Sequence, residues 1–472
     1  MDGGVPNPAC QSEALAAMLS GLPEIARAAL VDPVPPRNWN DWSALAPEAP
    51  AALFCPRSVK QVSVILAAAN AARVPVVPQG GLTGLCGGAR PIAGGIALSL
   101  EKMVGIEEID EASATMTVLA GTPLETIQKA AAERGMFFSL DLGARGSCAI
   151  GGNAGTNAGG NRVIRYGMMR DLVLGAEVVL PDGTVVNALS KLIKNNTGYD
   201  VRQLFIGSEG TLGVITRLVL RLHPAPGCTH AAICGLRDYG KVVDLLRGAR
   251  RKLGPMLSAF EAMWPDYWQV ACAVPGVRDP LDGPHAHTVL IEAQGTDEDI
   301  DGPRFMAFLE AMFDEGIIDD AAISQSLSDV QSFWGVRDAC AEFKTTLGPH
   351  HAYDVGLPTG QMDAFADACR VAVAAAVPGG RSVYYGHIGD GNLHLLAWVP
   401  GADPQPGETL DEAVYATVRA FGGSVSAEHG IGTTKKKYLE FSRTPEELDV
   451  MRRVKHALDP NGILNPGKVI DA

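Results

Sequence analysis

The residues best suited to chemistry are three histidines and a glutamate in the C-terminal third of the chain. His387 and His394 lie on either side of a Gly-Asp-Gly-Asn segment at 389–392, and Glu428 and His429 follow later. In a plain strand this spacing places the two imidazoles on opposite faces, but a turn between them can bring both to one spot. Two imidazoles and a carboxylate suit a borderline divalent metal and leave positions for water or substrate. A metal site is one interpretation, and a glycine-rich turn with an incidental histidine is the other.

Three glycine-rich runs lie in the N-terminal half, at 78–88, 143–160 and 207–213. Glycine lets consecutive amide groups converge on an anion without interference from Cβ. The first run matches neither the nucleoside-triphosphate loop nor the Gly-x-Gly-x-x-Gly dinucleotide pattern. Because each ordered glycine costs extra backbone entropy, three such runs predict an extended cofactor threaded between subdomains. The first run alone could equally be a structural turn.

Length and composition restrict the class of protein. A chain of 472 residues predicts two or three domains, and an apolar fraction of 47% argues against extensive disorder. The net charge of -14 argues against a nucleic-acid partner, which needs a concentrated basic surface. Nine scattered cysteines without a Cys-x-x-Cys pair predict reduced thiols and a cytoplasmic location. We expect no signal peptide and no spanning segment, and leave peripheral membrane contact open.

The periodicity of apolar residues predicts an α+β protein. Strands are expected at about 51–56, 74–78, 96–99, 115–120, 176–180, 288–293 and 395–399, and helices at about 12–30, 58–69, 124–133, 301–314, 360–375 and 445–458. The helix from Ser58 opens with a capping-box pattern. A change of composition at Pro224-Ala225-Pro226-Gly227 predicts a domain boundary there.

Linked motifs along the chain resemble a known family. The segments 78–84, 149–152, 157–160, 165–167 and 206–213 are similar to the vanillyl-alcohol-oxidase/para-cresol-methylhydroxylase (PCMH) type of flavoprotein. The segments 386–394, 428–432 and 465–468 narrow this to the D-2-hydroxyacid dehydrogenase branch, which includes D-lactate, glycolate and D-2-hydroxyglutarate dehydrogenases. The resemblance covers nearly the whole chain, from Pro56 to Lys468.

The resemblance implies a two-part α+β FAD-binding domain of the PCMH type. An α+β substrate (cap) domain with an antiparallel sheet would follow, and the C-terminal segment would return to the FAD domain. We expect the boundaries at 1–224, 225–425 and 426–472. Since neither early glycine run contains histidine, an 8α-histidyl link is not expected and FAD should be non-covalent. The residues expected to bind FAD are Pro78, Gln79, Gly80, Gly81, Leu82, Thr83, Gly84, Ile150, Gly151, Gly152, Asn153, Thr156, Asn157, Gly160, Gly213, Ile215 and Asn465.

By the same resemblance, His387, His394 and Glu428 match the ligands of a divalent metal, expected to be zinc with manganese or cobalt as alternatives. His429 matches the general base that takes the hydroxyl proton while hydride leaves C2 for flavin N5. Arg337 matches the arginine that clamps the substrate carboxylate, for which its planar fork is suited. Asn392 is expected to contact flavin or substrate.

Three positions depart from the pattern of the hydroxyglutarate enzymes. Ala352 stands where those enzymes typically carry lysine, Ala341 where they tend to have threonine, and Leu396 where they have asparagine. These polar groups would bind a distal carboxylate, so we expect a D-lactate-like or larger hydrophobic D-2-hydroxyacid, with D-2-hydroxyglutarate or D-malate as the alternative. The residues that could wall an apolar pocket, or serve as plain core, are Met263, Trp264 and Trp268.

Two rival functions are weighed. An ether-lipid-synthase-like flavoenzyme without net redox chemistry would lack the two-histidine, one-glutamate set found here. A non-catalytic flavin-binding module would not need His429. The expected partners are a small hydroxyacid and an electron acceptor such as electron-transfer flavoprotein, quinone or cytochrome, and a homodimer is left open.

Overall fold

The structure is a computed structural model that describes residues 8–471. Its chain forms two compact units. The first unit comprises Met1–Gly160, Gly167–Pro224 and His429–Ala472, and the second comprises Asn161–Tyr166 and Ala225–Glu428. Each unit is described by itself.

The first unit begins with a small mixed sheet in the order β1-β2-β4-β3. Strands β2 and β3 pair in parallel with β4, and β1 pairs antiparallel with β2. Helix α3 (Val59–Ala72) connects β2 to β3, and Ser58 caps it by accepting a hydrogen bond from the Gln61 amide. The bounds of the strands are β1 (Leu30–Val31), β2 (Ala52–Phe54), β3 (Val76–Gln79) and β4 (Ile96–Ser99).

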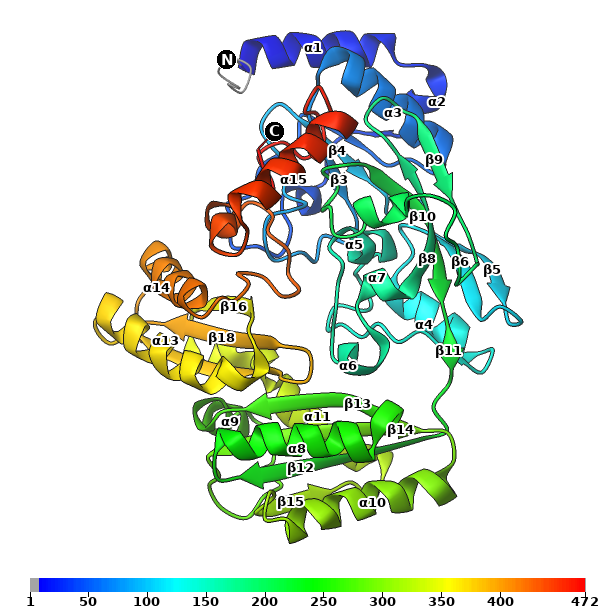
Figure 1. The fold of residues 1–472 in the computed structure, drawn as a ribbon. Coiled ribbons are helices and arrows are strands. Elements are labelled where there is room, and N and C mark those ends of the chain that lie inside the picture. The colour runs from blue at the N-terminus through cyan, green and yellow to red at the C-terminus, as the bar shows by residue number, and fades with distance from the viewer. Residues whose placement is uncertain (1–7, 472) are drawn as a thin grey trace. The chain divides into compact units, whose positions relative to one another are not determined.

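A second sheet of the first unit is antiparallel, in the order β5-β6-β10-β8-β9 (Figure 1). Strand β8, which lies between β10 and β9, is buried along its whole length, as is typical of a strand covered on both faces. The bounds are β5 (Ile106–Asp110), β6 (Thr115–Leu119), β8 (Val173–Val179), β9 (Val185–Ala188) and β10 (Val214–Arg221). A short ladder pairs β7 (Met136–Phe137) with β11 (His223–Pro224).

The main helices of the first unit are α1 (Pro8–Gly21), α2 (Glu24–Arg27), α4 (Leu124–Ala132), α5 (Ile150–Gly155), α7 (Met169–Leu172) and α15 (Pro445–Leu458). The single helix expected at 12–30 is wrong. Helix α1 ends at Gly21 and a separate short helix starts after Pro23, because proline cannot continue an α-helical hydrogen-bond ladder. The expected helix at 445–458 is confirmed, with a capping box between Thr444 and Glu447.

The second unit is built on one antiparallel sheet in the order β15-β12-β14-β13-β17-β18-β16. The bounds of its strands are β12 (Cys228–Leu236), β13 (Leu257–Met263), β14 (His287–Gly295), β15 (Asp320–Ile323), β16 (His351–Gly356), β17 (Arg381–His387) and β18 (Asn392–Trp398). The helices are α6 (Val163–Tyr166), α8 (Tyr239–Lys252), α9 (Pro265–Cys272), α10 (Glu298–Asp314), α11 (Leu327–Asp338), α12 (Phe343–Leu347), α13 (Met362–Ala376) and α14 (Gly407–Ala420). The α+β class and the antiparallel sheet of this part are therefore confirmed.

The two faces of this sheet bury different sets of side chains. Val383 and Tyr385 of β17 join one apolar core with residues of α9 and α11. The side chain between them, Tyr384, points to the other face and packs near Trp264 and Arg370. Alternate residues of one strand thus serve two different environments.

Among the described residues, no helix is both long enough and apolar enough to cross a bilayer.

Candidate active site

A tight hairpin in the second unit brings His387 and His394 together. Strand β17 ends at His387 and β18 starts at Asn392, so the Gly-Asp-Gly segment makes the turn. The imidazole centroids lie 5.1 Å apart with their planes at 81°. Gly386 is required beside the turn, because an added Cβ would lie 2.6 Å from the Asn392 carbonyl oxygen. The fold-back inferred from the sequence is present.

A buried aspartate positions Glu428 near the two histidines. Asp354 lies opposite His394 in the register of β16 and β18 and is fully buried. Its carboxylate accepts the Glu428 amide at 3.0 Å and the Ser426 hydroxyl at 3.1 Å, which fixes the segment leading to Glu428. The ligand atoms offered by His387, His394 and Glu428 all lie within 4.8 Å of one another.

A buried ionic network lies directly behind His387. Glu261 of β13 forms a hydrogen bond with each of two neighbours. One carboxylate oxygen lies 2.6 Å from His387 Nδ1, and the other accepts a hydrogen bond from Arg337 Nε at 2.9 Å. Arg337 Nη2 lies 3.2 Å from His387 Nε2. Burial alone would raise the pKa of Glu261, but the neighbouring His387 and Arg337 charges outweigh it and lower the pKa to about 2. Burial alone would lower the pKa of His387, but the charge and hydrogen bond of Glu261 outweigh the effect of burial and raise the pKa of His387 to about 9.

This arrangement fits a divalent cation. Two imidazoles and one carboxylate converge, and the carboxylate of Glu261 orients the far ring nitrogen of His387 as outer partners of metal-bound histidine do. His387 Nε2 lies 3.2 Å from Arg337 Nη2, and it is the ring nitrogen at which a cation would replace a proton, since Nδ1 is bonded to Glu261.

Asn392 adds a polar group next to the two histidines. It starts β18 two residues before His394, so both side chains point to the same face of the strand. The side chain is 4% exposed, and neither its oxygen nor its nitrogen has a hydrogen-bond partner within the described chain. A buried amide without a partner is costly, which favours a ligand at this position.

Glu261 and Asp354 are functional candidates that the sequence reasoning missed. Each is a lone carboxylate in a strand that is otherwise mostly apolar, Leu257–Met263 for Glu261 and His351–Gly356 for Asp354. An acidic residue in a buried strand requires a buried partner, so this pattern was a usable signal. The pattern does not identify which group pairs with each carboxylate.

His429 is the first residue of the C-terminal segment of the first unit. The turn that follows it is anchored there, because the half-buried Glu209 carboxylate accepts hydrogen bonds from the amides of Ile431 at 2.7 Å and Gly432 at 2.9 Å. Close packing leaves no room for a side chain at Gly432, since an added Cβ would lie 2.1 Å from the Cys86 carbonyl oxygen.

The three glycine runs meet within the first unit. An added Cβ at Gly81 would lie 2.1 Å from the Ser147 carbonyl oxygen, so the first and second runs are in backbone contact. The Glu209 amide donates to Gly155 at 2.8 Å, which joins the third run to the second. The Asn465 amide nitrogen donates to the Glu209 carbonyl at 2.7 Å, which adds the C-terminal tail.

The loop at 78–84 offers backbone donors. Within the described chain, the amides of residues 81–84 donate no hydrogen bond to another backbone group. In the contacting run, the side-chain oxygen of Asn153 is buried and has no partner. Free amides on a glycine loop next to an unsatisfied buried polar atom fit the phosphates and polar edge of a dinucleotide.

The other expected FAD residues occupy the same unit in varied settings. Thr156 bonds back to the Gly152 carbonyl at 3.1 Å, and Asn157, at φ 50°, accepts the Arg170 amide at 2.8 Å. Gly160 has no room for a Cβ beside the Asp141 carbonyl. Gly213 precedes β10, and Ile215 is a buried residue of that strand. The expected residues not yet placed are Pro78 and Gln79 at the end of β3, Gly80, Leu82, Thr83 and Gly84 in the loop, and Ile150, Gly151 and Gly152 in α5.

Two family models and several curated proteins match this chain. Residues 50–189 match the family described as "FAD binding domain", and residues 226–469 match "FAD linked oxidases, C-terminal domain". The chain is 39% identical over 431 residues to the mitochondrial D-2-hydroxyglutarate dehydrogenase of Bos taurus, covering 91% of this chain and 78% of that protein. It is 39% identical over 424 residues to a putative mitochondrial D-lactate dehydrogenase of Schizosaccharomyces pombe, covering 88% and 81%.

The chain belongs to the family of FAD-dependent D-2-hydroxyacid dehydrogenases. It is an FAD-dependent oxidoreductase that acts on a CH–OH donor. A solved 4-ethylphenol oxidase from Gulosibacter chungangensis superposes with a TM-score of 0.77 at 19% identity, covering 100% of this chain and 98% of that one, which shows the PCMH-type fold alone. The expected family and fold class are thus confirmed.

The three positions at which this sequence departs from the pattern of the hydroxyglutarate enzymes have different surroundings in the structure. Ala352 lies directly opposite Leu396 in the register of β16 and β18, two residue pairs beyond Asp354 and His394 and therefore on the same face of the sheet. Leu396 is buried in the core that contains Val383 and Tyr385, and Ala352 is exposed. Ala341 lies on the short 3-10 helix that follows α11, one turn beyond Arg337.

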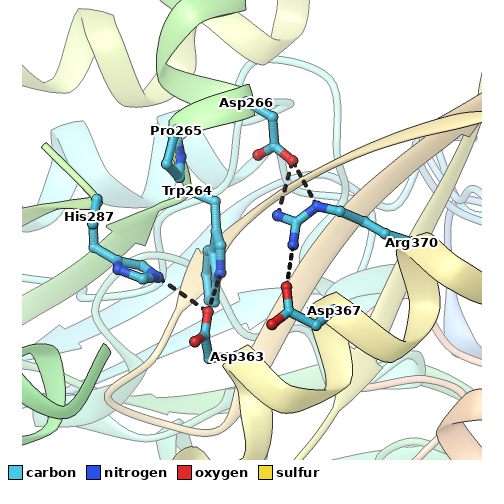
Figure 2. Close-up of a pocket in the computed structure, with 8 residues that line it drawn as sticks. Trp264, Pro265, Asp266, His287, Asp363, Asp367 and Arg370 are labelled. Carbon is cyan, nitrogen blue, oxygen red and sulfur yellow. Dashed lines mark hydrogen bonds and ion pairs between the residues drawn. The ribbon is translucent and has the colours of Figure 1, made fainter. Parts of the chain in front are cut away.

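The three residues considered for an apolar wall do not line one pocket. Met263 is fully buried in the core on the Tyr385 side of the sheet. Trp264 instead lines a separate cleft of about 420 Å³ with His287, Asp363 and Arg370 (Figure 2). There Asp363 accepts from the Trp264 indole at 2.8 Å and lies 3.2 Å from His287, while Arg370 binds Asp266 and Asp367. The indole of Trp268 donates to Asp279 at 3.0 Å.

Proposed function

We propose that this dehydrogenase oxidises a D-2-hydroxyacid with an apolar side chain to the 2-oxoacid, by hydride transfer from C2 to N5 of a non-covalently bound FAD. The first unit is the FAD-binding module and the second is the substrate module. The electrons pass on to an acceptor of the electron-transfer flavoprotein, quinone or cytochrome class.

One observation carries the proposal. The ligand atoms of His387, His394 and Glu428 converge within 4.8 Å beside a buried arginine and a buried amide that has no partner. A 2-hydroxyacid presents a hydroxyl and a carboxylate on adjacent carbons, and these two groups match a cation site flanked by a guanidinium and an amide. When bound, the divalent cation supplies Lewis-acid polarisation of the hydroxyl and FAD supplies the hydride acceptor.

The residues of the chain then have separate tasks. Arg337 holds the substrate carboxylate: its Nη2 faces His387 Nε2, and once Nε2 serves as a ligand this N–H is released for the carboxylate. Glu261 keeps Arg337 charged and in place. Asn392 orients the substrate through its amide.

His429 removes the hydroxyl proton at an imidazole nitrogen. It follows Glu428 directly in a bend of the chain, so a metal ligand and a base would be neighbours in sequence.

The apolar side chain of the substrate is inferred from the strand register. Beyond His394 the same face of the sheet carries Leu396, and Ala352 lies opposite it. Neither residue can pair with a distal carboxylate, and leaving that charge without a partner in a partly buried site would be unfavourable.

The names of the relatives favour a second candidate, D-2-hydroxyglutarate. That name is carried by relatives that are 36–39% identical to this chain. D-malate has the same class of distal carboxylate and belongs with this candidate. A non-redox ether-lipid synthase-like activity and a purely flavin-binding role are not favoured by any contact described above.

A substrate panel with the variant Ala352→Lys separates the two candidates. The wild type should reduce its flavin with D-lactate and longer apolar D-2-hydroxyacids in preference to D-2-hydroxyglutarate. The added lysine should raise the kcat/KM for D-2-hydroxyglutarate relative to D-lactate by about 10- to 100-fold, the effect of one hydrogen bond to a charged group of about 1.5–3 kcal/mol. The matched control is Ala376→Lys, which adds the same charge at an exposed position at the end of α13.

Two outcomes would contradict the proposal. A wild type that prefers D-2-hydroxyglutarate would replace the apolar substrate with the second candidate. Flavin that is reduced by no D-2-hydroxyacid would remove both.

A further inference from the structure

A second group of metal-binding side chains lies in the second unit, on strand β12 and the start of helix α10. Cys228 and His230 are two residues apart in β12, so their side chains share one face of the strand. Glu298 is the first residue of α10, which packs against β12 (Figure 1). The thiol, imidazole and carboxylate ligand atoms all lie within 4.8 Å of one another.

The imidazole of His230 is held in one orientation. Its ring stacks on Phe305 with centroids 5.6 Å apart and planes at 22°. Its Nε2 points toward the Glu298 carboxylate at 3.5 Å and is buried without a hydrogen-bond partner in the described chain. A fixed imidazole with an unsatisfied nitrogen is a ready ligand position.

Two glycines leave room for the cluster. An added Cβ at Gly302, on the first turns of α10, would lie 2.9 Å from a Glu298 carboxylate oxygen and 3.4 Å from His230 Cε1. Gly295 lies opposite Cys228 in the β12–β14 register, and a Cβ there would lie 2.3 Å from the Asp301 carboxylate. Asp301 therefore reaches over the strand to within 4.0 Å of the Cys228 sulfur.

The environment of the thiol explains why a cation would be favoured. Cys228 is 8% exposed, its sulfur lies 4.0 Å from an Asp301 carboxylate oxygen, and the Glu298 carboxylate belongs to the same cluster. A divalent cation would displace the thiol proton to solvent and neutralise the carboxylates, so binding is accompanied by proton release.

We propose that Cys228, His230 and Glu298 form a second divalent-cation site, of zinc type, that ties strand β12 to the start of helix α10. Thiolate, imidazole and carboxylate are all zinc ligands, and three protein ligands with a water complete a tetrahedral shell. The thiolate selects against magnesium and calcium, which prefer oxygen ligands. Glu298 is largely exposed, so the site opens to solvent on the helix side. This site shares no residue with the group formed by His387, His394 and Glu428.

Cobalt is the probe that separates the two sites. The FAD-loaded full-length protein is freed of metal with a chelator and titrated with Co²⁺, and each spectrum is recorded against the same protein without metal. A thiolate-to-cobalt charge-transfer band reports only a cysteine ligand, and the other group contains none. We expect this band to appear, to be lost in Cys228→Ser and to persist in His394→Ala.

Two further variants keep the test decisive if Cys228→Ser fails to fold. Glu298→Gln changes an exposed side chain and should weaken the affinity measured from the band at least ~10-fold, the loss that even an outer-shell partner can cause. Cys272→Ser is the matched control, because this free, half-buried cysteine lies elsewhere in the same unit and should leave the band unchanged. Absence of the band in the wild type would overturn the proposal, as would its survival in Cys228→Ser or an unchanged affinity in Glu298→Gln.

Discussion

The second unit contains two groups of side chains that could hold a metal ion, and the groups differ in how firmly the protein positions them. His387, His394 and Glu428 are held from behind: Glu261 bonds His387, and Asp354 bonds the amide of Glu428. In the group on β12 and α10, only the His230 ring is held by stacking, and Glu298 is an exposed side chain. The first group is positioned by protein contacts alone, whereas the second, as proposed above, would be completed by a cation.

This difference indicates different roles. A catalytic site must keep its ligands in place while substrate enters and product leaves, so its support comes from buried bonds that do not depend on the cation. A site that ties a strand to a helix needs no such support, because cation binding itself supplies the free energy that favours the folded unit.

The largest expected effect is on catalysis. His394→Ala should slow flavin reduction by a D-2-hydroxyacid about 10³-fold, because Lewis-acid stabilisation of the developing alkoxide is worth several kcal/mol, at tenfold per 1.36 kcal/mol. Anaerobic stopped-flow absorbance of the flavin measures the rate. Cys228→Ser should keep the wild-type rate. Equal slowing in both variants would break the distinction between the two sites.

The next effect is on metal affinity. Glu261→Gln should weaken cation binding at the catalytic group about 10- to 100-fold, because it removes the partner that orients His387. Glu292→Gln is the matched control: this carboxylate is equally buried on the neighbouring strand β14 and pairs with Arg162 and Trp334. Both variants should lose stability, but competition with a chelator should show weaker binding only for Glu261→Gln. A loss of affinity in the control would mean that general destabilisation is the cause.

The pH dependence of stability should report the same network. Glu261 has a pKa of about 2 in the folded protein against a usual 4.5, so its contribution is present above pH 4.5 and is lost as the pH falls toward 2. His387 has a pKa of about 9 against a usual 6.5, so its contribution is complete below pH 6.5 and is lost as the pH rises through 9. Metal-free protein should therefore be most stable between about pH 4.5 and 6.5, and the decline toward pH 9 should amount to at most about 3 kcal/mol. Urea unfolding midpoints measured across this range provide the test, and the decline should be absent in Glu261→Gln. A flat profile above pH 6.5 in the wild type would contradict the assigned charges.

The smallest effect is expected at the second group. Glu298→Gln should change the free energy of unfolding of metal-free protein by no more than about 0.5 kcal/mol, as is usual for an exposed side chain. The same urea experiment, in the presence of chelator, measures it. A loss well above 1 kcal/mol would mean that this group too is positioned without a cation, and the contrast between the sites would disappear.

Much of the fold could be predicted from the sequence, because local patterns determined it. The capping pattern at Ser58 placed the start of one helix, and the Gly-Asp-Gly turn correctly implied that His387 and His394 face each other. The helix at 12–30 was wrong because Pro23 was given too little weight. The order of the seven strands depends on pairings between residues far apart in the chain, which no local pattern encodes.

The supporting residues of the site were harder to predict. Glu261 is 126 residues from His387 in sequence, and only the β13–β17 register places them opposite each other. The same holds for Asp354 and the segment before Glu428. Ligand types can be recognised from chemistry and spacing, whereas the carboxylates that orient them come from separate strands and become visible only in the folded sheet.

The most direct test of the central claim is removal and return of the cation. FAD-loaded protein is treated with a chelator, mixed anaerobically with D-lactate, and then supplied with Zn²⁺ or Mn²⁺ while the flavin absorbance is followed. We expect the flavin to stay oxidised after chelation and to be bleached when the cation returns, and we expect no such recovery in His394→Ala. Full bleaching in the chelated protein, at the rate of the untreated protein, would contradict it.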